Sequence, residues 1–94
     1  MPNYKISEIA EADLVRIYHW GSQRYGRAHA DQYFAAFFEH FEQLAEQPLS
    51  YPLTEIREGY RRSVCGSDNV YYRIRDGIVE IMAIVGAQDA DQWL

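Results

Sequence analysis

The stretch that decides the fold is VYYRIRDGIVEIMAIV, residues 70–85. Apolar and polar residues alternate on both sides of Asp76-Gly77, and Asp-Gly between two alternating runs predicts a β-hairpin. The turn fixes the register, so that Arg73 should face Glu80 and Tyr71 should face Met82. One side of the hairpin should meet the core, with Val70, Tyr72, Ile74, Val79, Ile81 and Ala83. The other side should form the open face of the sheet, with Tyr71, Arg73, Arg75, Glu80 and Met82.

A further strand is predicted over residues 60–65, YRRSVC, joined to the hairpin by a turn at 66–69. Arg61 and Arg62 are adjacent in this strand, so only one of them can point outward. Each alternates with a different set of neighbours, and the sequence leaves open which arginine faces solvent.

Helical periodicity fills the first half of the chain. After a short alternating strand, NYKIS at 3–7, Ser7 suits a helix N-cap, and a helix is predicted over 8–24. Gly26 marks a break before a strongly amphipathic helix over 28–46, whose aromatic stripe is best explained as a core face. The predicted fold class is α+β: an N-terminal strand and an antiparallel two-helix hairpin packed on one face of a small, mainly antiparallel sheet.

Composition narrows the class of protein. The 94 residues predict one domain, 1–94, and the formal net charge of −5 argues against a general nucleic-acid binder. The single cysteine, Cys65, cannot form an internal disulfide. The start of the chain lacks a signal-peptide pattern and no apolar run approaches a membrane span, so we expect a soluble cytoplasmic protein with no membrane contact.

The chain offers little for metal or cofactor chemistry. No strong metal-ligand spacing and no phosphate-cradling glycine loop occur, so we expect no metal site and no cofactor. The histidines His19, His29 and His40 all fall in the helical region, away from the predicted open face.

Four segments together resemble the ParE branch of the RelE/ParE superfamily of bacterial type II toxin–antitoxin systems. The opening YKISEIAEADLVRIYHWGSQRYG (4–26) and the second helix with its Gln-Pro ending, at 30–52, are similar to the family pattern. The most specific segment is IREGYRRSVCGSDNVYYRI (56–74), and VEIMAIVGAQD (79–89) resembles the closing strand.

The resemblance implies a toxin that inhibits DNA gyrase by protein–protein contact and is neutralised by a cognate ParD-like antitoxin. Operator DNA would be reached only indirectly, through the antitoxin. RelE-like relatives share the fold but cut messenger RNA on the ribosome, so a ribosome-dependent endoribonuclease is the alternative. A toxin that has lost its activity and only sequesters its antitoxin is a third possibility.

The residues after the last strand favour the gyrase hypothesis. GAQDADQWL (86–94) contains no Lys, Arg, His or Tyr to assist RNA cleavage, and its aspartates would repel phosphate. RNase activity is not excluded, because Arg61, Arg73 and Tyr71 could bind phosphate. The simplest explanation of the arginines is a solvated face paired with nearby carboxylates.

The functional interpretation of the same surface is a docking face, because Arg and aromatic side chains suit protein interfaces. We therefore predict an antitoxin- or target-binding set and no catalytic residue. Its members are Arg61, Arg62, Tyr71, Arg73, Met82 and Trp93. The family dependence on the C-terminal segment for toxicity points to residues 89–94.

Overall fold

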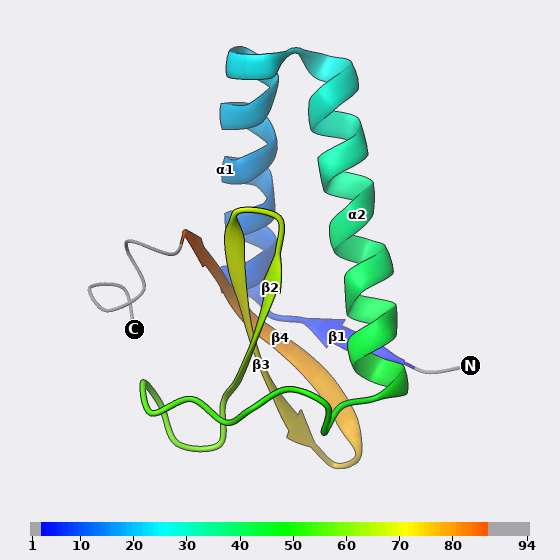
Figure 1. Ribbon diagram of the computed structural model, residues 1–94, viewed down its shortest axis with the longest axis vertical. Coiled ribbons are helices and arrows are strands. Elements are labelled where there is room, and N and C mark those ends of the chain that lie inside the picture. Colours follow the sequence, from blue (N-terminus) through cyan, green and yellow to red (C-terminus); the bar gives the residue numbers. More distant parts are fainter. Residues whose placement is uncertain (1–2, 87–94) are drawn as a thin grey trace.

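The computed structural model describes residues 3–86. Its elements, in chain order, are β1 (Tyr4–Ile6), α1 (Glu8–Tyr25), α2 (Arg27–Glu46), β2 (Arg61–Cys65), β3 (Asp68–Arg75) and β4 (Ile78–Gly86). The strands form one mixed sheet in the order β1-β4-β3-β2, in which β1 runs parallel to β4 and the other neighbours are antiparallel. The two helices stand side by side as a hairpin that extends beyond the strands (Figure 1). The predicted α+β class is confirmed.

Local signals set the helix boundaries. The hydroxyl of Ser7 accepts a hydrogen bond from the Ala10 N–H at 3.0 Å, which caps α1 at the predicted residue. Gly26 has φ of 94°, a conformation that glycine adopts readily, and separates the two helices. Both helices therefore lie within one residue of the predicted bounds.

The main core lies between the helices and the sheet. Phe37, Phe41 and Leu44 of α2 are fully buried and pack in one cluster with Val70 and Ile81 of the sheet. Burying each such side chain is worth about 1.5–3 kcal/mol. The aromatic stripe of the second helix is therefore a core face, as predicted.

Helix α1 also satisfies the backbone of β4 where β1 no longer covers it. The parallel pairing with β1 ends at Ile81, whose carbonyl accepts a hydrogen bond from the Ser7 N–H at 2.9 Å. Two residues after Met82, Asp13 Oδ2 accepts from the Ile84 N–H at 2.9 Å, and Arg16 Nη2 donates to the Ile84 carbonyl at 3.2 Å. Side chains of α1 thus replace a neighbouring strand along this part of the edge.

Asp13 is the buried member of this arrangement. Its side chain is almost completely shielded, and burial raises the pKa of the carboxyl, while hydrogen bonds from Ile84 and Arg16 oppose the rise. Arg16 lies 3.4 Å from Asp13 Oδ1 and remains largely exposed. The carboxylate is held by its hydrogen bonds, since a buried charge without them would be strongly disfavoured.

A β-bulge between β3 and β4 corrects the predicted register. The pairs from Arg75–Ile78 to Tyr72–Ile81 are as predicted, but Tyr71 then pairs with Ala83 instead of Met82. Met82 is the extra residue, and it reverses the parity of the rest of β4. The predicted core position of Ala83 is therefore wrong: Ala83 lies on the side of the sheet away from the helices, and Ile84 takes the core position.

The turn before β3 is also shorter than predicted. Only Gly66 and Ser67 form it, because Asp68 and Asn69 already belong to β3. Gly66 has φ of 61°, and a Cβ at this position would collide with the ring of Tyr33. Only glycine fits both the backbone conformation and the space.

We expect Asp13→Ala to lower the free energy of unfolding by about 1–3 kcal/mol, because it leaves the buried Ile84 N–H without an acceptor. Asp13→Asn keeps an oxygen that can accept this hydrogen bond and should recover most of the loss. Urea unfolding followed by circular dichroism measures both variants. Equal stability of Asp13→Ala and the unchanged chain would show that the Ile84 amide does not depend on this carboxylate.

Candidate protein-binding site

The outer face, defined as the side of the sheet away from the helices, is partly covered. Tyr60 and Ile56, from the segment before β2, pack there with Tyr71, Ala83 and Val85 in a second apolar cluster. Tyr71 is fully buried. The prediction of an open face with Tyr71 exposed on it is wrong at this point, because a segment without regular structure lies across the strand.

The two adjacent arginines of β2 point to opposite sides of the sheet. Arg62 pairs in register with Tyr71 and is exposed on the outer face. Arg61 pairs with Tyr72 on the helix side, is half-buried, and donates from Nη1 to the Tyr51 carbonyl at 2.6 Å. The ambiguity is therefore resolved: Arg62 is the outward residue, and the guanidinium of Arg61 is engaged within the chain.

The predicted cross-strand ion pair is present. Arg73 Nε lies 3.0 Å from Glu80 Oε1, and both side chains are partly exposed, so the pair contributes only a fraction of a kcal/mol, about 0.2–1. Arg75 is exposed on the same side of β3. On the strands, the outer face thus carries Lys5, Arg62, Arg73 and Arg75 against Glu80, a local positive excess in a chain whose net charge is −5.

Met82 and Trp93 complete the predicted set. Met82 is half-buried at the bulge, beside the second apolar cluster, and its carbonyl accepts from the Ser7 hydroxyl at 3.0 Å. Trp93 and the segment 89–94 lie outside the described residues.

A buried polar contact joins α2 to β2 on the helix side of the sheet. His40 Nε2 lies 2.7 Å from the hydroxyl of Ser63, which is almost fully buried. Burial lowers the pKa of His40 below its ordinary value. The contact faces away from the outer face and ties a helix to an edge strand.

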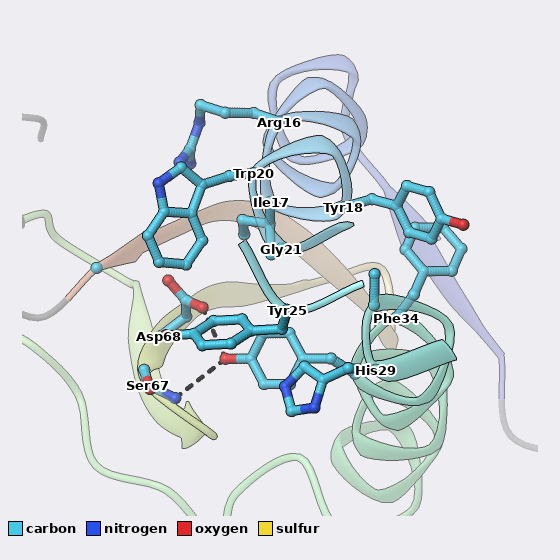
Figure 2. Close-up of a pocket in the computed structure, with 13 residues that line it drawn as sticks. Arg16, Ile17, Tyr18, Trp20, Gly21, Tyr25, His29, Phe34, Ser67 and Asp68 are labelled. Carbon is cyan, nitrogen blue, oxygen red and sulfur yellow. Dashed lines mark hydrogen bonds between the residues drawn. The ribbon is translucent and has the colours of Figure 1, made fainter. Parts of the chain in front are cut away.

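A groove between the helical hairpin and the β2–β3 turn was not predicted from the sequence. It has a volume of about 800 Å³ and is bordered by Trp20 and Tyr25, whose rings are more than half exposed. The two rings meet edge to face at 5.9 Å, and Tyr25 contacts His29 at 5.0 Å. In Figure 2 the rings of Trp20 and Tyr25 point toward Asp68, the first residue of β3 after the turn.

The turn side of the groove is fixed by Tyr33. Its hydroxyl donates to Asp68 Oδ2 at 2.7 Å and accepts from the Ser67 N–H at 3.0 Å. Figure 2 marks these bonds as dashed lines at the labelled Ser67 and Asp68. Burial and the hydrogen bond to Asp68 raise the pKa of Tyr33. The available sequence signal was the pair of aromatic residues, Trp20 and Tyr25, just before the Gly26 break, but only the fold brings the turn opposite them.

Both surfaces suit contacts with another protein. The outer face offers an exposed guanidinium beside apolar residues, and the groove offers exposed aromatic rings, the side chains that carry most energy at interfaces. Within residues 3–86, no group of three or more His, Cys, Asp and Glu side chains could hold a metal ion. Neither described helix is both long and apolar enough to span a bilayer.

Two helices on one face of a four-stranded mixed sheet, with exposed arginine and aromatic surfaces, define a small α+β protein with a fold found in type II toxin–antitoxin systems. A solved chain described as "Chromosomal ParDE TA system from P. aeruginosa" has this fold, with a TM-score of 0.81 and 19% identity over 92% of this chain and 96% of that one. The chain belongs to the ParE toxin family: the family model "ParE toxin of type II toxin-antitoxin system, parDE" matches residues 4–90.

Similar proteins include toxins from two bacteria. Toxin ParE1 of Caulobacter vibrioides is 37% identical over 87 residues, which cover 90% of this chain and 88% of that toxin. Toxin ParE1 of Mycobacterium tuberculosis is 29% identical over 84 residues, which cover 87% and 86% of the two chains.

The His40–Ser63 contact makes stability depend on pH. Because the pKa of His40 is lower in the folded chain, the unfolded chain takes up the proton first. The contribution of neutral His40 to the free energy of unfolding should be fully present above about pH 6.5 and should be lost as the pH falls through the folded-state pKa of His40. His40→Gln should lose less stability than the unchanged chain between about pH 7.5 and about pH 5.5 in urea unfolding. Equal losses in the two proteins would contradict this role for His40.

Proposed function

We propose that this toxin inhibits DNA gyrase by direct protein–protein contact and that a ParD-like antitoxin neutralises it. Membership of the ParE toxin family is the observation that carries the proposal. DNA gyrase is a cytoplasmic enzyme, so the proposed place of action is the cytoplasm. The toxin would need no cofactor and would approach operator DNA only through its antitoxin.

The two exposed surfaces support action through contact. The outer face places Arg62, Arg73 and Arg75 where an acidic protein segment could pair with them. The groove presents the Trp20 and Tyr25 rings to an apolar side chain of a partner. We assign the antitoxin to the outer face, since its positive excess gives the clearer chemical preference.

The positions of the histidines also favour contact over catalysis. His40 is bonded to Ser63 on the helix side of the sheet, and His29 lies in the groove at the start of α2. Neither is next to the outer-face arginines that would hold an RNA phosphate. An acid or base must reach the reacting group within hydrogen-bond distance, and these imidazoles lie on other surfaces.

Purified toxin should inhibit DNA supercoiling by gyrase or accumulate gyrase-cleaved DNA, and the antitoxin should reverse the effect. Electrophoresis of plasmid topoisomers measures both activities. No effect on gyrase, combined with arrest of a cell-free translation reaction and cleavage of messenger RNA, would instead establish the endoribonuclease function. Normal growth of cells that express the toxin alone would favour an inactive protein that only binds antitoxin.

Arg62→Glu should weaken the complex with the antitoxin at least tenfold, because an outward guanidinium is replaced by a carboxylate facing an acidic partner. Arg27→Glu is the matched control, since it makes the same charge change at an exposed position at the start of α2. Calorimetric titration of the purified proteins gives both affinities. Equal affinity of Arg62→Glu and Arg27→Glu would exclude the outer face as the antitoxin site.

A further inference from the structure

The side chain of Tyr71 is buried in an unusual way. It is fully shielded from solvent, and its hydroxyl has no hydrogen-bond partner among the described residues. A buried polar group without a partner destabilises a protein, and native structures keep few of them. This hydroxyl therefore lowers the stability of the folded toxin, and its burial needs an explanation.

The neighbouring tyrosine shows the usual arrangement. Tyr72 is equally buried, but it points to the helix side, where its hydroxyl donates to the Pro48 carbonyl at 2.8 Å. The two tyrosines are consecutive in β3 and lie on opposite sides of the sheet. Of these two hydroxyls, the one on the outer face lacks an acceptor among residues 3–86.

Residues 54–60, which we call the cover segment, lie over Tyr71. Their hydrogen bonds among the described residues close the segment on itself: Thr54 N–H to Tyr60 O at 2.8 Å, Tyr60 N–H to Arg57 O at 3.1 Å, and Ile56 N–H to the Thr54 hydroxyl at 3.2 Å. The segment touches the sheet through the apolar side chains of Ile56 and Tyr60. The start of the segment is tied to β2 by the bridge between Leu53 and Arg61, where the Arg62 N–H donates to the Pro52 carbonyl at 3.2 Å. Lifting Ile56 and Tyr60 away from Tyr71 would break side-chain packing and leave the hydrogen bonds between β2, β3 and β4 intact.

The surroundings of Tyr71 favour an acidic and apolar occupant. Arg62 is its cross-strand neighbour and is exposed, and Arg73 follows two residues later on the same side of β3. Val64, two residues after Arg62 on the same side of β2, is 61% exposed. A protein segment with carboxylates and apolar side chains would match this combination.

We propose that the antitoxin binds the outer face by displacing the cover segment and that an acceptor oxygen of the antitoxin takes the hydrogen bond of the Tyr71 hydroxyl. This inference rests on the proposed antitoxin and adds where and how it binds. The buried hydroxyl lowers the stability of the free toxin and strengthens the complex, so one group links both properties. Ile56 and Tyr60 fill the site in the free chain, and apolar side chains of the antitoxin replace them.

The test compares Tyr71→Phe with Tyr72→Phe in the full chain. Removing the unpartnered hydroxyl should raise the Tm of free toxin by about 4–8 °C and weaken antitoxin binding about tenfold. Tyr72→Phe removes a satisfied hydroxyl on the other side, so it should lower the Tm and leave the affinity within about twofold. The probe is the ParD-like protein encoded beside the toxin, measured by calorimetric titration, and thermal unfolding gives the Tm values.

The outcomes separate this inference from the proposed function. If the antitoxin binds the unchanged toxin and Tyr71→Phe equally well, the proposed role of the hydroxyl in binding is wrong. The proposal that a ParD-like antitoxin binds this toxin is then unaffected. If Tyr71→Phe lowers the Tm as Tyr72→Phe does, the hydroxyl is already satisfied, for example by a buried water, and the inference is overturned. If the unchanged toxin does not bind the ParD-like protein, the proposed function itself fails.

Discussion

The hydrogen bonds from α1 to the part of the β4 edge that β1 does not cover are the constraint on which this structure depends. The parallel strand β1 covers β4 only as far as Ile81, and a buried strand edge beyond that point would leave backbone groups without partners. Asp13 and Arg16 meet the N–H and the carbonyl of Ile84, while Ser7 both caps α1 and holds the Ile81 carbonyl. The cap that starts the helix thereby also fixes where the helix lies against the sheet.

The bulge at Met82 decides which residues the two faces receive. Without it, Ala83 would point to the helices and Ile84 would point away from them. With it, Ile84 joins the main core, and Ala83 and Val85 form the small apolar cluster under Tyr60. The bulge at Met82 lies next to Ser7 and two residues before Ile84, whose backbone is hydrogen-bonded by Asp13 and Arg16. The change of parity and the hydrogen bonds to α1 therefore belong to one local arrangement.

The surfaces available to partners follow from these two features. Arg62 and the cover segment lie over the outer face, and the groove with Trp20 and Tyr25 opens where the helical hairpin extends past the strands toward the β2–β3 turn. A ParE-family toxin must meet more than one protein in the proposed function, and two chemically different surfaces are suited to that need. The charged surface favours an acidic segment, whereas the aromatic groove favours an apolar one.

The sequence by itself determined the helices, the Asp76-Gly77 hairpin, the Arg73–Glu80 pair and the core stripe of α2, because periodicity, caps and tight turns are local properties. It could not determine which of Arg61 and Arg62 faces outward, since strand parity is relative until one residue is anchored. The tertiary structure alone decided the bulge at Met82, the burial of Tyr71 and the groove at Trp20. Each of these depends on contacts between segments far apart in the chain: α1 with β4, residues 54–60 with β3, and the helices with the β2–β3 turn.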